Sequence, residues 1–233
     1  MTVLNILSGG AAQGLVASLA QHFKALTGFD IGGDFGAVGA MAAKLRKGTP
    51  ADIVILTAKM IADLARENLV IDTSISDIGL VETAIAVRAG DSLVAVNDAA
   101  ALRAAFLAAD AIFVPDTKAS TAGIHVAQVL QQLGIADDVT ARLKIFPNGA
   151  TAMRALAASD ATNPIGCTQS TEIIGTPGVM LSGALPRGCE LSTMYTAAIT
   201  TGAANAKQAQ MLIGLLIGAA QRELRERAGF IAA

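Results

Sequence analysis

The stretch Ser8-Gly9-Gly10-Ala11-Ala12-Gln13-Gly14 separates two different apolar patterns near the start of the chain. A continuous apolar run, residues 3–7, precedes it and predicts a buried strand, whereas Leu15, Leu19 and Phe23 follow it at helical spacing. A glycine turn between a strand and a helix directs the unpaired N–H groups of the helix N-terminus toward whatever lies above them, and the helix dipole adds to their attraction for an anion. The stretch therefore predicts a strand–turn–helix unit that binds an anionic group.

The same plan recurs along the chain. A strand at residues 30–35 leads through a second glycine turn, Gly36-Ala37-Val38-Gly39, into a helix at residues 40–46. Further strands are expected at residues 52–56, 80–88, 111–114, 143–146, 165–168, 179–181 and 191–199, and further helices at residues 11–26, 59–67, 99–108, 124–133, 150–158 and 206–227. Because strands and helices alternate, we expect an α/β protein with parallel sheets and right-handed crossovers.

The strand–turn–helix units form two groups, which predict two Rossmann-like lobes. The first lobe is expected to comprise residues 1–82 plus 197–233, and the second lobe residues 83–196. Extended segments near residues 80–88 and 190–199 would connect them, and the last helix would return to the first lobe. Ligands of open α/β sheets bind beyond the carboxyl ends of the strands, so we expect a ligand cleft between the two lobes.

The amino-acid composition argues against two kinds of partner, nucleic acids and membranes. Apolar residues make up 53% of the 233 residues and charged residues 15%, as expected for parallel strands that helices cover on both faces. Aromatic residues make up 3% and the net charge is −2, which argues against a nucleic-acid partner. No apolar run is long enough to span a bilayer, so membrane insertion is not expected.

Two sequence features leave alternatives open. Cys167 and Cys189 fit either a disulfide or two buried free thiols, and a chain of this size favours the thiols. No basic segment precedes the first strand, so we expect a cytoplasmic protein, or a periplasmic one from which a signal peptide was removed.

Three segments carry a resemblance to a known family. With the Ser8 turn, the segments Asp34-Phe35-Gly36-Ala37-Val38-Gly39-Ala40-Met41-Ala42, Gly48-Thr49-Pro50-Ala51-Asp52-Ile53-Val54-Ile55 and Thr121-Ala122-Gly123-Ile124-His125-Val126-Ala127 are similar to type 2 periplasmic binding proteins. The molybdate-binding branch, which includes aconitate isomerase, resembles the chain most. The resemblance covers nearly the whole chain and implies the type 2 periplasmic-binding-protein fold, with two lobes and a ligand cleft between them.

Departures from that branch suggest a pocket adapted to a different anion. Molybdate binders place serines in both turns of the first lobe, whereas the second turn here, Gly36-Ala37-Val38, has no hydroxyl group. The tyrosine of the second-lobe helix is replaced by His125. The resemblance to aconitate isomerase implies an enzyme that moves a proton between two carbons, a 1,3-proton shift that needs only one or two proton-transfer groups.

The function expected from this resemblance is a cofactor-independent isomerase of a small unsaturated polycarboxylate. The alternative is a non-catalytic solute-binding protein of an ABC transporter, for molybdate or another small oxyanion or carboxylate, with an ABC permease as partner. A third reading is a cytoplasmic ligand sensor that reports to another protein. No metal site is expected, because no histidine or cysteine has ligand spacing, and no P-loop is present.

The expected ligand contacts are glycine turns, helix starts and polar strand ends. They are Ser8, Gly9, Gly10, Ala11, Gly36, Ala37, Val38, Ser120, Thr121, Ala122, Gly123, Asn148, Gly149, Thr168, Gln169 and Tyr195. Each has a structural alternative, because glycine turns also permit close packing of a strand on a helix, Ser and Thr are common N-caps, and a tyrosine also serves in hinge packing.

His125 is the expected catalytic base. It lies in the first turn of a helix whose N-terminus should point at the ligand, and an imidazole suits proton transfer near neutral pH. The alternative is a partly buried structural histidine. Glu172 and Lys118 are further candidates for proton transfer or carboxylate pairing, and ordinary surface charges are the alternative for both.

Overall fold

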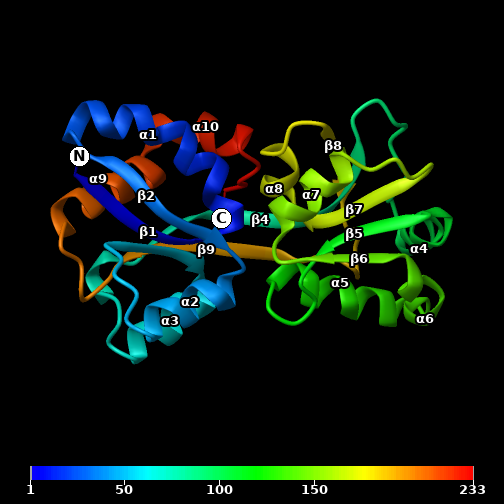
Figure 1. Cartoon of the computed structure of the whole chain (residues 1–233), viewed down its shortest axis with the longest axis horizontal. Coiled ribbons are helices and arrows are strands. Elements are labelled where there is room, and N and C mark those ends of the chain that lie inside the picture. Colours follow the sequence, from blue (N-terminus) through cyan, green and yellow to red (C-terminus); the bar gives the residue numbers. More distant parts are fainter. Residues whose placement is uncertain (1, 233) are drawn as a thin grey trace. The chain divides into compact units, whose positions relative to one another are not determined.

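The computed structural model describes residues 2–232 and divides the chain into two compact units. Unit 1 comprises Met1–Val81 and Thr193–Ala233, and unit 2 comprises Glu82–Ser192. Strands β4 (Ser76–Arg88) and β9 (Ser192–Ile199) carry the chain from one unit to the other (Figure 1).

Unit 1 contains a sheet with the strand order β2-β1-β3-β9. Strand β1 (Val3–Gly9) is parallel to β2 (Asp30–Gly36) and to β3 (Ile53–Thr57), and β9 is antiparallel to β3. A 3-10 turn, η1 (Gly10–Ala12), leads from β1 into helix α1. The sheet is thus parallel where the strand–turn–helix units predict it and antiparallel where the connecting strand joins it.

Helices cover both faces of the unit 1 sheet (Figure 1). Helix α1 (Gln13–Thr27) packs against α9 (Ala206–Ile217), and α2 (Val38–Arg46) packs against α3 (Ala58–Arg66). The apolar side chains of α1 that recur at helical spacing are buried at Leu15, Leu19 and Phe23.

Unit 2 contains a second sheet with the strand order β4-β7-β5-β6. Strand β5 (Ala111–Pro115) is parallel to β6 (Leu143–Phe146) and β7 (Pro164–Gln169), whereas β4 is antiparallel to β7 and to the added strand β8 (Val179–Ala184). The helices are α4 (Ala99–Ala108), α5 (Thr121–Gln132), α6 (Ala136–Val139), α7 (Gly149–Ala157) and α8 (Ser170–Ile174).

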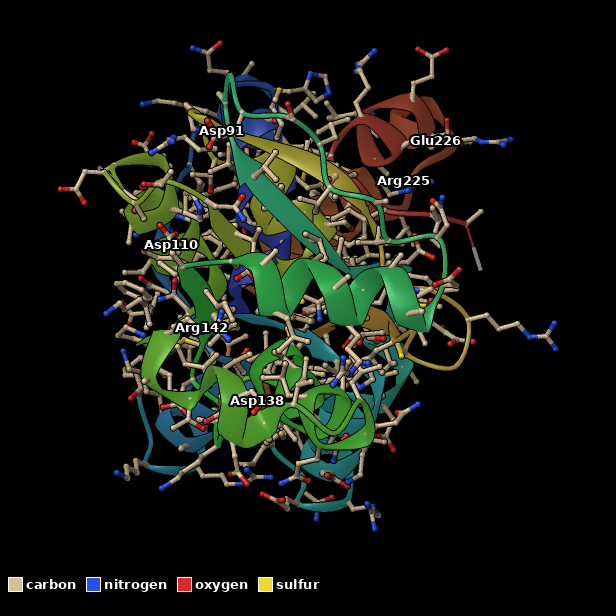
Figure 2. All side chains as sticks on the ribbon, turned by 90° about the vertical axis from the view of Figure 1, so that its right-hand side faces the viewer. Asp91, Asp110, Asp138, Arg142, Arg225 and Glu226 are labelled. Atoms are coloured by element: carbon tan, nitrogen blue, oxygen red, sulfur yellow. The ribbon has the colours of Figure 1, made fainter. Side chains whose placement is uncertain are left out.

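The alternation of side chains along β4 defines two faces in unit 2. Ile85 and Val87 belong to the core that includes residues of α4, α5 and α6, which we call the α5 face. Ala84 and Ala86 belong to the core formed with α7 and α8, which we call the α7 face. On the α5 side, the Arg142 guanidinium donates to the carbonyl oxygens of Leu107 and Ala109 at 2.8 and 2.6 Å and holds the end of α4 (Figure 2).

The prediction of one long final helix at residues 206–227 is wrong. The chain forms α9, a short 3-10 turn η4 (Ala219–Gln221) and then α10 (Arg222–Arg227). Gly218 interrupts the helix with an extended backbone, at φ −57° and ψ 143°. Arg225 supports the break, because its Nη1 donates to the carbonyl oxygens of Leu216 and Gly218 at 3.0 and 2.8 Å.

The last described residues pair with the connecting strand β4. Leu80 and Ile231 exchange two backbone hydrogen bonds of 2.9 Å each, and the preceding Phe230 side chain is buried. Short 3-10 turns at η2 (Asp72–Ser74) and η3 (Thr140–Arg142) complete the regular elements of the described residues.

The segment Gly48-Thr49-Pro50-Ala51-Asp52 has a structural role. The buried Asp52 carboxylate accepts from the backbone N–H groups of Asn5 and Asn205, both at 2.8 Å. It therefore joins the start of β1 to the loop that precedes α9. Within residues 2–232 no helix has both the length and the apolar character needed to cross a membrane. Cys167 and Cys189 are buried free thiols, as the chain size favours.

Candidate functional site

In unit 1, the two predicted glycine turns lie side by side. The register pairs Ser8 with Phe35 and Gly9 with Gly36 on neighbouring parallel strands. The carboxyl ends of β1 and β2 therefore meet at one edge of the sheet, and η1 and helix α2 begin there.

The helices that begin at this edge differ in whether a side chain caps their N-terminus. Helix α3 is closed by its own N-cap, because the Thr57 hydroxyl oxygen accepts from the Met60 N–H at 3.3 Å. The N-caps of η1 and α2 are Gly9 and Ala37, and neither makes a side-chain cap. Ala37 lacks a polar side chain, and the first backbone bond of α2 runs from the Met41 N–H to the Ala37 carbonyl at 3.1 Å. The N–H groups of α2 that come before Met41, and those at the start of η1, are therefore not capped by a side chain.

The turn at Ser8 and Gly9 is tightly packed against side chains of unit 1. A side chain at Gly9 would lie 2.9 Å from both Tyr195 Cε1 and Val38 Cγ1. The buried Ser8 hydroxyl donates to the Gly9 carbonyl at 2.9 Å, and the Tyr195 ring meets Phe230 edge-on at 6.5 Å. These contacts give Ser8, Gly9 and Tyr195 clear packing roles, while their contact with a ligand stays a prediction.

In unit 2, strands β5, β6 and β7 end at one edge, where helices α5, α7 and α8 begin. The predicted residues of this unit all lie at that edge or in the first turns of those helices. They fall into two sets, because α5 packs on one face of the sheet and α7 and α8 pack on the other.

On the α7 face, a carboxylate of the chain itself occupies the helix start. The Thr168 hydroxyl donates to Glu172 Oε2 at 2.6 Å, and the same carboxylate accepts from the backbone N–H groups of Gly149, Ala150 and Gln169. A side chain at Gly149 would lie 1.9 Å from Glu172 Oε2. Thr168 and Gly149 therefore have internal partners.

The Asn148 side chain completes this arrangement as an ordinary N-cap. Its Oδ1 accepts from the Thr151 N–H at 2.8 Å. Glu172 is buried, so its description as a surface charge is wrong, whereas Lys118 is exposed. Burial raises the pKa of the Glu172 carboxyl, and the hydrogen bonds that it accepts oppose this rise.

On the α5 face, the start of the helix is uncapped. Ser120 is the N-cap of α5 but makes no side-chain cap, and the first helical bond runs from the Ile124 N–H to the Ser120 carbonyl at 2.9 Å. A side chain at Gly123 would lie 2.2 Å from the Asp116 carbonyl oxygen, so this glycine permits the helix to approach the end of β5 closely. The N–H groups of Thr121, Ala122 and Gly123 precede the first helical bond.

Gln169 belongs to the α5 face by alternation with Cys167 and Ile165, which lie in that core. Its side chain is 3% exposed, and neither its Oε1 nor its Nε2 has a hydrogen-bond partner among the described residues. A buried amide with both groups unpaired is costly, which marks this residue as unusual for a purely structural position.

His125 has a structural partner. Its Nε2 lies 2.8 Å from the carbonyl oxygen of Cys189, and because a carbonyl only accepts, Nε2 carries the hydrogen. The Nδ1 atom is then the acceptor of the neutral ring. The contact joins α5 to the loop that precedes β9, and the role of His125 as a base stays a prediction.

Comparison with known proteins identifies the family. Residues 4–231 match the family model described as bacterial extracellular solute-binding protein. The chain belongs to this family. It has the type 2 periplasmic-binding-protein fold that the sequence resemblance implies, and this prediction is confirmed.

Individual relatives share only a small part of their sequence with this chain. Aconitate isomerase from Pseudomonas sp is 23% identical over 227 residues, which cover 93% of this chain and 82% of the relative. The molybdate-binding protein ModA of Escherichia coli is 23% identical over 238 residues, covering 97% of this chain and 88% of the relative. The periplasmic molybdate-binding protein of Azotobacter vinelandii superposes with a TM-score of 0.82 at 19% identity, and the match covers 99% of both chains.

The structural role of Glu172 was missed by the sequence reasoning, although a signal was present. Gln169 is the N-cap of α8 and Glu172 stands three residues later, which is the spacing at which a glutamate reaches back to the N-cap N–H. Within residues 2–232, histidine, cysteine and carboxylate side chains do not gather in threes or more around a point that a metal ion could occupy.

Proposed function

We propose that the chain binds small organic carboxylates through backbone N–H groups at uncapped helix starts, those of η1 and α2 in unit 1 and that of α5 in unit 2. The observation that carries the proposal is the distribution of caps. The starts of α3 and α7 are closed by Thr57 and by Asn148 with Glu172, although Asn148 is itself a predicted contact, whereas the starts of η1, α2 and α5 have no side-chain cap.

The chemistry of the donors supports an anion of this class. Helix N-termini carry partial positive charge and present N–H groups that suit carboxylate oxygens. The second turn offers only backbone donors, because Ala37 and Val38 have apolar side chains. The two curated relatives act on or bind anions, aconitate in one case and molybdate in the other, which agrees with an anionic ligand.

Calorimetric titration with citrate, malate, trans-aconitate and molybdate tests the proposal. We expect at least one carboxylate to bind, and the variant Ala37→Asp to weaken its affinity at least tenfold, about 1.4 kcal/mol, because a carboxylate at the N-cap closes the start of α2 and repels the ligand.

The matched control is Asp98→Ala, which removes the cap of a helix away from the predicted turns. The Asp98 Oδ1 accepts from the Ala101 N–H at 2.8 Å, so its loss lowers stability without altering affinity. Absence of binding by every carboxylate, or equal effects of the two variants on affinity, would contradict the proposal.

An isomerase activity is the second candidate. The match to aconitate isomerase over 93% of this chain favours it, and the hydrogen bond of His125 leaves Nδ1 as the acceptor that a base requires. In a 1,3-proton shift, the base removes a proton from one carbon of the allylic system and a proton is returned to the other carbon, so no cofactor or co-reactant is consumed.

A proton NMR time course with trans-aconitate in heavy water tests this activity. We expect cis-aconitate to accumulate with the native chain and not with His125→Gln, whose amide keeps a donor for the Cys189 carbonyl but has no basic nitrogen. His22→Gln is the control, because His22 is exposed on α1. Binding of trans-aconitate without conversion would leave the chain as a solute-binding protein of the non-catalytic type.

A further inference from the structure

Unit 2 contains a buried polar pair of which the sequence indicated only one member, Gln169. Thr83 on β4 lies directly opposite Gln169 on β7 in the antiparallel register. The two residues are 1% and 3% exposed. Thr83 Oγ1 and both polar atoms of the Gln169 amide are without a hydrogen-bond partner among residues 2–232.

Both side chains lie on the α5 face of the sheet. Thr83 alternates with Ile85 and Val87 along β4, and Gln169 alternates with Cys167 along β7, and these apolar residues all belong to the core on that face. The uncapped start of α5 lies at the same edge and on the same face. Paired residues of an antiparallel ladder present their side chains to the same side, so the hydroxyl and the amide are neighbours.

We propose that Thr83 and Gln169 form a subsite for a hydroxyl group, and that the ligand is therefore a hydroxycarboxylate. The proposal rests on the carboxylate-binding function proposed above and specifies its ligand. The N–H groups of α5 hold a carboxylate, while the polar pair recognises the neighbouring hydroxyl.

The hydrogen-bond donors and acceptors of Thr83 and Gln169 favour a hydroxyl group as their ligand. The Gln169 Nε2 and the Thr83 hydroxyl can donate to any anion, but the Gln169 Oε1 only accepts. A fully ionised carboxylate or molybdate supplies no hydrogen to Oε1, whereas a ligand hydroxyl both donates and accepts. A site built to pair a hydroxyl rejects the analogue that lacks it, because the buried groups are then left unpaired.

Two matched pairs of acids isolate the hydroxyl. Citrate differs from tricarballylate, and malate from succinate, by one hydroxyl group at an otherwise unchanged carboxylate skeleton. We expect the native chain to bind the hydroxy acid of at least one pair about tenfold or more tightly than its partner. Citrate is also expected to bind more tightly than trans-aconitate, which has no hydroxyl.

Variants of the polar pair supply the structural test. Thr83→Val and Gln169→Met keep the side-chain size and remove the polar atoms, and each is expected to reduce the hydroxy-acid preference to within about threefold while the acid without a hydroxyl still binds. The melting temperature of the ligand-free protein is expected to rise in Thr83→Val, because an unpaired buried hydroxyl is removed. Thr176→Val is the control, since the buried Thr176 hydroxyl already donates to the Glu172 carbonyl at 2.7 Å.

The outcomes separate the two proposals. Equal affinity of the native chain for both members of each pair, or a preference that persists in both variants, overturns the hydroxyl subsite and leaves carboxylate binding in place. Failure of these four acids and of trans-aconitate to bind overturns the proposed function itself. A lost preference in Thr176→Val as well would show that removal of any buried hydroxyl in unit 2 has the same effect, which also contradicts the subsite.

Discussion

At the scale of single residues, replacement of two helical glycines by alanine is expected to change the free energy of unfolding in opposite directions. Gly123 lies in the first turn of α5, where an added Cβ would be 2.2 Å from the Asp116 carbonyl oxygen, whereas an added Cβ at Gly14 of α1 meets nothing within 4 Å. We expect Gly123→Ala to lower the free energy of unfolding by about 2 kcal/mol, because α5 must move away from β5. Gly14→Ala should raise it by about 0.5–1 kcal/mol, since alanine favours the helix.

Urea unfolding of the two glycine variants measures this difference through the midpoint, provided that the slope is unchanged. A Gly123→Ala protein as stable as the native chain would show that α5 does not approach β5 as closely as described.

Glu172 predicts a pH dependence of stability. Burial raises the pKa of its carboxyl above the ordinary value of 4.5. The folded state therefore binds more protons than the unfolded state above pH 4.5, so the contribution of Glu172 to stability decreases as the pH rises from there toward the raised pKa. The slope from one group is at most about 1.4 kcal/mol per pH unit.

The comparison of native protein with Glu172→Gln isolates this group. We expect the stability of the native protein, relative to the variant, to decrease as the pH rises above 4.5, measured by urea unfolding at a series of pH values. A relative stability that increases over this range would contradict the raised pKa.

At the scale of elements, the C-terminal segment acts as an added edge of β4. Phe230 is buried against Tyr195, while the following Ile231 is 43% exposed although its backbone pairs with Leu80. We expect Phe230→Ala to lower the free energy of unfolding by about 3–5 kcal/mol through the cavity that it leaves. Ile231→Ala should change it by less than about 1 kcal/mol, because the pairing uses only the backbone. Similar losses in thermal unfolding of both variants would contradict this division.

At the scale of the whole molecule, ligand binding and stability are linked. A ligand that binds only the folded chain at a concentration 100-fold above its Kd adds about 2.7 kcal/mol to the free energy of unfolding. We expect the melting temperature to rise with the logarithm of the concentration of the bound carboxylate, and to rise less in Ala37→Asp at equal concentration. A melting temperature that is independent of the concentration of a ligand seen to bind in calorimetry would contradict binding to the folded state.

The strand–turn–helix order, the α/β class and the family follow from the sequence by itself. Local rules suffice for the element order and the α/β class, because helical spacing, continuous apolar runs and glycine turns act over a few neighbouring residues, whereas the family was implied by the resemblance of longer segments. The same rules located the turns at Ser8 and Gly36, and the register places these turns at one sheet edge. Local periodicity failed at Gly218, where long-range packing of Phe230 and the backbone pairing of Ile231 accompany the break in the last helix.

Only the tertiary structure decided which polar groups have partners. Thr168 and Gln169 are adjacent in the sequence and equally plausible ligand contacts, yet the pleat sends them to opposite faces of β7. Thr168 meets Glu172 on the α7 face, whereas Gln169 lies buried and unpaired beside Thr83, which is distant in sequence. Burial and pairing depend on residues brought together by the sheet, and that information is absent from any local stretch of the chain.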